Sequence, residues 1–233
     1  MIGVFDYTVV LTYLSLLSAG SGIVISLSDS GHPYIGVFFL LFCGLLDAFD
    51  GRVARTKRNR TELEKKFGVQ IDSLSDLVAF GVLPACIGAA IIRSPKFMEP
   101  ITNAPKLIGK VLYFLAFAVL ILYILAALIR LAYFNVEEEE RQKTESGPRK
   151  YFTGVPVTTA ALIFPSIMLL RYIFNPLEIG VLYFIGIVIT GFLFVSKIQI
   201  PKPRTRGILI MIGIGVVEFV IFSVYMFIFH HKL

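Results

Sequence analysis

Four aspartates in the first third of the chain have the residue type and the spacing of a metal-binding site. Asp47 and Asp50 are three residues apart and Asp72 and Asp76 are four apart, so each pair shares one face of a helix. Carboxylates within a membrane helix are costly and mark a functional site. Without histidine or cysteine beside them, they suit hard divalent cations such as Mg²⁺ or Mn²⁺ rather than zinc.

The chemistry that such a cluster supports is phosphoryl-type transfer. Two divalent cations held by the four aspartates could bind a diphosphate, neutralise its charge and stabilise the phosphate that leaves. Three small residues beside the carboxylates leave room for a ligand to approach the backbone, namely Gly51, Ala54 and Gly68. Arg55 can bind a phosphate through its planar guanidinium group.

Membrane helices must position these residues. Of the 233 residues 56% are hydrophobic and the mean hydropathy is +0.80, which predicts an all-α polytopic membrane protein, residues 1–233 forming a single integral membrane domain. We expect membrane helices at about 8–28, 34–56, 67–93, 108–135, 156–174, 178–196 and 207–229. The acidic run Glu137–Glu140 is expected in a solvated loop after the fourth helix.

The distribution of basic residues predicts the orientation. The loops after the second, fourth and sixth helices hold 15 of the 22 Lys and Arg residues, against 6 on the opposite side. This bias predicts a multi-pass protein of the cell membrane with the aspartates at the cytoplasmic face. Because the basic residues are confined to loops, the net charge of +6 indicates lipid headgroups or nucleotide phosphates as partners and no nucleic acid.

The pattern Asp-x2-Asp-Gly-x2-Ala-Arg, followed by Gly-x3-Asp-x3-Asp, closely resembles the motif of the CDP-alcohol phosphotransferases. These are integral membrane enzymes that displace CMP from a CDP-linked lipid or alcohol. All eight defining positions are present, as Asp47, Asp50, Gly51, Ala54, Arg55, Gly68, Asp72 and Asp76. The resemblance implies a six-helix core, at about 8–200 here, so that the helix at about 207–229 is additional.

The same resemblance implies cofactors, an assembly and a role for each motif residue. It implies two divalent cations, Mg²⁺ or Mn²⁺, and a homodimer. The implied metal ligands are Asp47, Asp50, Asp72 and Asp76. The residues implied to bind the nucleotide and its diphosphate are Asp50, Gly51, Ala54, Arg55 and Gly68. The last aspartate, Asp76, is implied to be the general base on the acceptor hydroxyl as well.

The spacer between the two halves of the motif departs from the family pattern. It usually has about eight residues, whereas here it has twelve, from Thr56 to Phe67. We expect the extra residues to lengthen the cytoplasmic turn. If they extended a helix instead, Asp72 and Asp76 would be misplaced.

Over roughly residues 8–205 the chain resembles the phosphatidylserine synthase branch of that family. The segments that carry this resemblance are 68–84, 130–135, 152–156 and 195–201. It implies CDP-diacylglycerol and L-serine as substrates. Serine is a zwitterion, so its carboxylate needs a cation, for which the candidates are Arg130 and Lys197, near the cytoplasmic ends of the fourth and sixth helices. Further hydrogen bonds could come from Asn135, Thr153 and Thr158.

The expected function is transfer of the phosphatidyl group from CDP-diacylglycerol to the serine hydroxyl, with release of CMP, a step of phospholipid biosynthesis. One alternative is another acceptor within the family, such as glycerol phosphate or an inositol phosphate, which would need a denser set of cations. A second is an intramembrane Mg²⁺-dependent prenyltransferase, although its two Asp-rich motifs lie further apart in sequence. A third is a transporter or channel, which would need polar residues along several helices.

Overall fold

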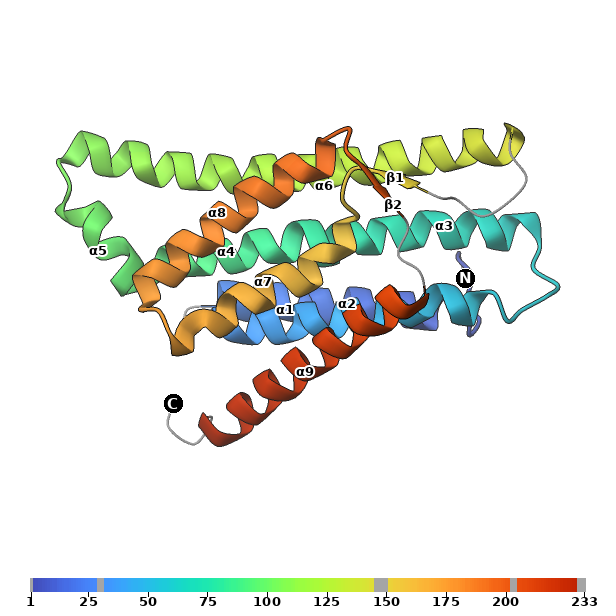
Figure 1. Ribbon diagram of the computed structural model, residues 1–233, viewed down its shortest axis with the longest axis horizontal. Helices are drawn as coiled ribbons and strands as arrows, with labels where there is room; N and C mark the ends of the chain where they lie inside the picture. Colours follow the sequence, from blue (N-terminus) through green and yellow to red (C-terminus); the bar gives the residue numbers. More distant parts are fainter. Residues whose placement is uncertain (1, 29–31, 145–150, 202–204, 230–233) are drawn as a thin grey trace.

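The protein folds as a bundle of long helices, as the sequence predicts (Figure 1). The computed structural model describes residues 2–28, 32–144, 151–201 and 205–229; five of the basic residues counted above, Arg149, Lys150, Lys202, Arg204 and Lys232, lie outside them. Five helices are long and apolar enough to cross a membrane, and shorter apolar helices span 157–172 and 209–224. The predicted all-α polytopic fold is confirmed.

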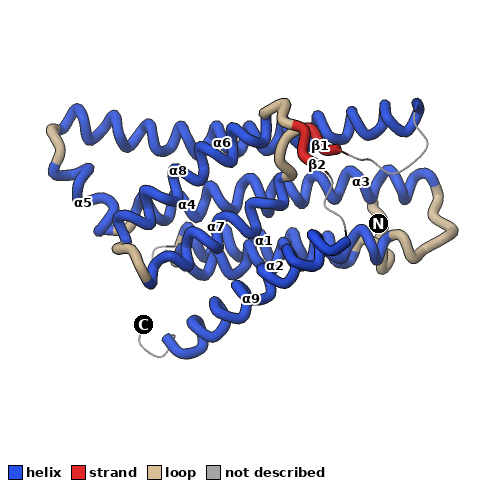
Figure 2. Tube along the Cα trace, viewed as in Figure 1, coloured by secondary structure: helices blue, strands red, loops and turns tan. Residues whose placement is uncertain are grey.

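The helices fall where the hydrophobic stretches place them, and two short strands accompany them (Figure 2). The helices are α1 (Val10–Leu27), α2 (Pro33–Ala54), α3 (Glu62–Asp76), α4 (Leu83–Arg93), α5 (Pro95–Asn103), α6 (Lys106–Thr144), α7 (Ala160–Leu169), α8 (Pro176–Val195) and α9 (Thr205–Phe229). A π-helical stretch (Leu77–Val82) and 3₁₀ turns (Val157–Thr159 and Leu170–Tyr172) connect some of them. The strands are β1 (Tyr151–Thr153) and β2 (Gln199–Pro201).

The predicted third membrane helix is one continuous run that comprises α3, the π-helical stretch and α4. Pro84 has no N–H, so it cannot donate to the carbonyl of Phe80, one turn earlier. The Tyr123 hydroxyl of α6 donates to that Phe80 oxygen at 2.8 Å, and the Tyr183 hydroxyl of α8 donates to the Pro84 oxygen at 2.8 Å. The two tyrosines therefore hydrogen-bond to backbone carbonyls of the central helix and join α6 and α8 to it.

Small residues bring α2 into close contact with its neighbours. A Cβ built on Gly44 would lie 2.5 Å from the Ala161 Cβ of α7, and one built on Gly36 would lie 2.8 Å from Ile87 of α4. At both positions the missing side chain is replaced by a neighbouring helix. These glycines therefore serve packing.

The two strands pair across α7 and α8, which separate them in the sequence, and no pattern in the sequence predicts this pairing. β1 pairs antiparallel with β2, with Phe152 opposite Ile200. Gly154, which follows β1, has φ +76°, and a Cβ there would lie 2.8 Å from the Phe194 oxygen, so only glycine fits. The pairing brings together segments 152–156 and 195–201, each of which carries part of the resemblance to the family. It places residues 152–158 against the interior of the bundle.

Two expectations about helix ends are wrong. The acidic run Glu137–Glu140 lies within α6 rather than in a loop, because cations on the next turn offset it: Arg141 pairs with Glu138 at 2.6 Å and Lys143 with Glu140 at 2.9 Å. As a result Arg130 lies well before the end of its helix, not near it.

The twelve-residue spacer also adopts helix in its second half. α3 begins at Glu62, with a capping box in which Thr61 and Glu64 each accept a hydrogen bond from the other's backbone N–H. The helix therefore grows at its N-terminal end, away from the aspartates, so Asp72 is not misplaced and reaches Asp47 and Asp50.

The links predicted to share one side of the membrane lie at one end of the bundle (Figure 1). The turn between α2 and α3 and the end of α6 lie at that end, the strands lie in the same half of the bundle, and α5 and the turn between α7 and α8 lie at the opposite end. Alternate links at alternate ends are the arrangement that a multi-pass protein requires.

Candidate active site

Three of the four aspartates converge where α2 passes α3. One carboxylate oxygen each from Asp47, Asp50 and Asp72 lies within 4.8 Å of the others. Asp50 is 9% exposed, and the other two are half-buried. Three carboxylates this close repel one another strongly unless a cation lies among them. The donor set, all oxygen and partly withdrawn from water, therefore fits hard divalent cations.

Helix α1 braces this cluster through a contact that the sequence does not predict. Thr12 Oγ1 donates to Asp50 Oδ2 at 3.3 Å, and Ser75 Oγ of α3 donates to the Thr12 carbonyl oxygen at 3.2 Å. A single threonine thus links the two helices that carry the aspartates. Nothing in the pattern of an apolar helix distinguishes Thr12 from Thr8, which instead hydrogen-bonds Asp6.

Asp76 stands apart from the set of three. It occupies the last residue of α3, one turn after Asp72, and lines a separate cavity of about 200 Å³. That cavity is bounded on the other side by Arg130 and by Phe152, Pro156 and Thr158. The predicted base and the predicted carboxylate-binding cation therefore face one space.

Arg130 is held in place by its own contacts. It is 5% exposed, its Nε donates to the Val155 oxygen at 3.2 Å, and its guanidinium carbon lies 5.2 Å from the centre of the Phe134 ring. Lys197, the other candidate for the serine carboxylate, is exposed in the link after α8 and is not among the residues that line the cavity with Arg130.

Of the remaining candidates for hydrogen bonding to serine, one lines the cavity with Asp76 and two bond to other side chains. Asn135 donates from Nδ2 to Ser73 Oγ at 2.8 Å, so it ties α6 to the residue next to Asp72. Thr158 lines the cavity with Asp76. Thr153 instead donates to Glu137 Oε1 at 2.9 Å and holds β1 against α6.

The motif glycines differ from the packing glycines of α2. A Cβ on Gly51 would meet nothing closer than the Arg55 guanidinium at 3.5 Å, and one on Gly68 would meet Arg60 Nη2 at 2.6 Å. Both neighbours are the ends of flexible side chains rather than another helix. Ala54 ends α2 and Arg55 follows it, exposed, so this face of the helix is open. The fold itself gives no reason for glycine here.

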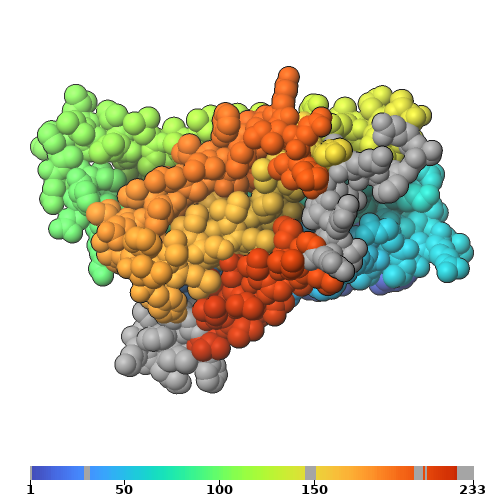
Figure 3. Space-filling model, viewed as in Figure 1, coloured from blue at the N-terminus to red at the C-terminus, as the bar shows by residue number. Residues whose placement is uncertain are grey.

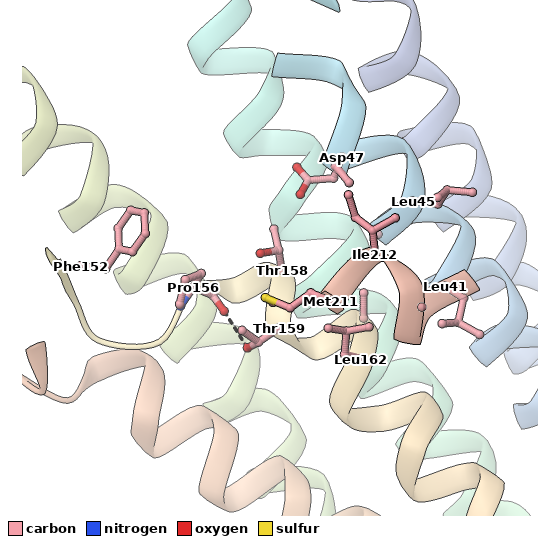
Figure 4. Close-up of a pocket in the computed structure, with 14 residues that line it drawn as sticks. Leu41, Leu45, Asp47, Phe152, Pro156, Thr158, Thr159, Leu162, Met211 and Ile212 are labelled. Carbon is pink, nitrogen blue, oxygen red and sulfur yellow. Dashed lines mark hydrogen bonds between the residues drawn. The ribbon is translucent and has the colours of Figure 1, made fainter. Parts of the chain in front are cut away.

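A second cavity, of about 310 Å³, begins at Asp47 (Figure 4). Its walls come from α2, from the start of α7 and from α9, and they are largely apolar. Figure 4 shows the Asp47 carboxylate pointing away from Leu41 and toward the side where Thr158 and Phe152 lie. Phe152, Pro156 and Thr158 border this cavity as well as the one at Asp76.

A sequence model of the CDP-alcohol phosphatidyltransferase family matches residues 7–195. The chain belongs to this family. The match includes every aspartate, glycine and arginine of the motif and ends at the last residue of α8, so α9 lies beyond it.

Curated relatives of the chain have names that agree with one another. The CDP-diacylglycerol–serine O-phosphatidyltransferase of Saccharomyces cerevisiae is 34% identical over 214 residues, which cover 82% of this chain and 70% of the yeast protein. The Helicobacter pylori protein of the same name is 31% identical over 74% of this chain and 63% of its own length, a little under two thirds. The archaetidylserine synthase of Methanothermobacter thermautotrophicus is 31% identical over 83% and 70%.

Proposed function

We propose that the protein transfers the phosphatidyl group of CDP-diacylglycerol to the hydroxyl of L-serine and releases CMP. The observation that carries this proposal is the arrangement of two adjoining sites. A cluster of three aspartates suited to divalent cations lies beside a cavity lined by both Asp76 and Arg130. The names of the relatives from yeast, a bacterium and an archaeon support serine as the acceptor.

Asp47, Asp50, Asp72 and Asp76 are the residues that would hold two divalent cations, Mg²⁺ or Mn²⁺. Bound there, the cations would neutralise the diphosphate and stabilise the CMP that leaves. Gly51, Ala54 and Gly68 leave the helix faces open to the cytidine nucleotide, and Arg55, at the exposed end of α2, is placed to bind a phosphate.

Asp76 and Arg130 act on different groups of serine. Arg130 binds the serine carboxylate, and we favour it over Lys197 because it is buried and lines the cavity with Asp76. Asp76 removes the proton from the serine hydroxyl, and the oxygen forms a bond to the phosphorus that carries the lipid. The bond from that phosphorus to the bridging oxygen breaks, and CMP leaves with the electron pair.

Anionic acceptors are a weaker alternative. Glycerol phosphate or an inositol phosphate would bring a phosphate group and would need several cations around it. Among the described residues that line the cavity at Asp76, Arg130 is the single cation.

We further propose, from the loop charges and the family resemblance, that the site faces the cytoplasm in the cell membrane and that the protein is a homodimer.

An acceptor panel tests the proposal. Purified protein receives CDP-diacylglycerol, Mg²⁺ or Mn²⁺, and serine, glycerol phosphate or inositol phosphate in separate reactions. CMP release above background with serine alone is expected. Release with a phosphorylated acceptor and none with serine would contradict the proposed acceptor but not the family's chemistry.

A further inference from the structure

Helix α9 supplies one wall of the apolar cavity that begins at Asp47, although it lies beyond the range of the family match. Met211, Ile212 and Gly215 line it from α9, facing Leu41 and Leu162 of α2 and α7. Figure 4 shows the ribbon that carries Met211 and Ile212 lying next to both of those helices. The helix therefore belongs to the surroundings of the candidate active site.

Two contacts fix α9 in this position. The Phe219 ring stacks on the Phe38 ring of α2 with their centres 4.9 Å apart. The Ser166 hydroxyl of α7 donates a hydrogen bond to Glu218 Oε1. Figure 3 shows the described part of α9 lying along the surface of α7.

Glu218 is an unusual residue in α9, because the other residues between 207 and 224 are all apolar or small. Its side chain is 4% exposed, and its second oxygen, Oε2, has no hydrogen-bond partner among the described residues. An acidic side chain in the membrane interior is costly, so its presence needs a compensating role. Holding α9 at one register and angle on α7 is the role that its contact with Ser166 supports.

The cavity suits a hydrocarbon chain. Most of its lining cannot hydrogen-bond, and its polar residues, Asp47, Thr158 and Thr159, are few. A volume of about 310 Å³ is at the lower end of the range for ligand pockets, so it would hold part of a lipid rather than the whole. A lipid whose diphosphate lies at the aspartates has its chains within reach of this space.

We propose that α9 completes a binding site for one hydrocarbon chain of the CDP-linked lipid, and that Gly215 determines how much of the chain enters. The proposal rests on the function proposed above. A Cβ at Gly215 would lie 3.4 Å from Leu162 Cδ2, an ordinary contact, so alanine fits whereas a longer side chain must extend into the cavity. Glu218 is a positioning residue that keeps this wall in place.

The test compares Gly215→Leu with Gly213→Leu as a matched control. A Cβ at Gly213 meets nothing within 4 Å, so leucine there changes the same helix without entering the cavity. Full-length protein in detergent with Mg²⁺ is titrated with CDP-dioctanoylglycerol and CDP-dioleoylglycerol, and thermal stabilisation reports binding of each lipid without turnover. Gly215→Leu should reduce the preference for the long-chain lipid about tenfold, while Gly213→Leu keeps the wild-type preference.

Glu218 is tested by the same readout. Glu218→Leu should lose the chain-length preference, because α9 is no longer held by Ser166, and Glu218→Gln should retain it, because the amide oxygen accepts the same hydrogen bond. Equal preference in wild type, Gly215→Leu and Gly213→Leu would overturn the proposal. Because binding is measured without an acceptor, failure of CMP release with serine would reject the proposed function and leave this readout intact.

Discussion

Asp76 and Arg130 line one cavity, although the first ends α3 and the second lies in the middle of α6. A carboxylate that can accept a proton and a cation that can bind an anion thus share a space beside a cluster of three more carboxylates. A zwitterionic alcohol is the acceptor that such a pair suits, since it presents a hydroxyl to one residue and a carboxylate to the other.

Replacing Arg130 should weaken binding of serine more than binding of the CDP-lipid. Arg130→Lys keeps the charge but loses the planar guanidinium and the bond from Nε to the Val155 oxygen, so we expect the KM for serine to rise about tenfold. Lys197→Met serves as the comparison, because that side chain is exposed. Initial rates at varied serine check this. A larger rise in Lys197→Met would move the carboxylate site to Lys197.

The motif glycines should matter for the nucleotide and not for folding. Gly51→Ala and Gly68→Ala are expected to keep the thermal stability of the wild type, since the new methyl group meets only flexible arginine side chains. CMP affinity should fall about tenfold, because the methyl group takes space that the ligand needs.

Two further glycines are the controls for that experiment. Gly20→Ala, where a Cβ meets nothing within 4 Å, should leave the CMP affinity unchanged and should not lower stability, because alanine favours the helix more than glycine does. Gly44→Ala, 2.5 Å from Ala161 Cβ, should destabilise the fold by about 1–3 kcal/mol. Unchanged CMP affinity in both Gly51→Ala and Gly68→Ala would remove these positions from the nucleotide site.

The hydrogen bond from Asn135 to Ser73 should support the position of Asp72. Asn135→Ala removes a 2.8 Å bond and should cost about 1 kcal/mol of stability, with about a tenfold loss of kcat. Ser73→Ala should do the same, and the double variant should resemble either single one, because both remove one interaction. Additive losses in kcat would show that the two residues act separately.

Outside the membrane-spanning helices, Lys57 pairs with Asp6 at 2.6 Å and with Glu64 at 2.7 Å, joining the N-terminal segment to the turn between α2 and α3. The hydrogen bond from Lys57, followed by that from the Thr8 hydroxyl, lowers the pKa of Asp6 to about 2. A lowered folded-state pKa stabilises the fold above the unfolded value of 3.8, and this contribution is lost as the pH falls toward 2. Wild type should therefore be more stable than Asp6→Asn near pH 6.

Unfolding midpoints of the two proteins in detergent, measured from about pH 6 down to about pH 2, check this dependence. The difference between them should shrink as the pH falls. A difference that stays constant over that range would mean that Asp6 is not stabilised by its partners in the folded protein.

Much of the site could be predicted from the sequence because helical spacing alone determines which residues share a face. Asp47 and Asp50 had to lie together on α2, and the short turn after α2 brings Asp72 to them. Contacts between residues far apart in the sequence leave no such pattern. β1 and β2 have three residues each and no alternating pattern, so their pairing, which places Phe152 and Thr158 beside the aspartates, could not be predicted.

The ends of some helices also differ from those that the sequence predicts. The run Glu137–Glu140 looked like a solvated loop because four like charges repel, but the following Arg141 and Lys143 offset them at helical spacing. α3 begins at Glu62, earlier than the predicted start at about residue 67, because the capping box at Thr61 lies inside a stretch of mixed charge that gives little hydrophobic periodicity.

The central claim is that Asp76 enables transfer of the phosphatidyl group to serine. The most direct measurement follows CMP and phosphatidylserine together, in wild type and in Asp76→Asn, with CDP-diacylglycerol, serine and Mg²⁺ or Mn²⁺. We predict equal amounts of the two products in wild type, loss of both on adding a chelator, and at least about a hundredfold slower transfer in Asp76→Asn with its fold intact. Phosphatidylserine formed at the wild-type rate by Asp76→Asn, or CMP released without it, would contradict the account.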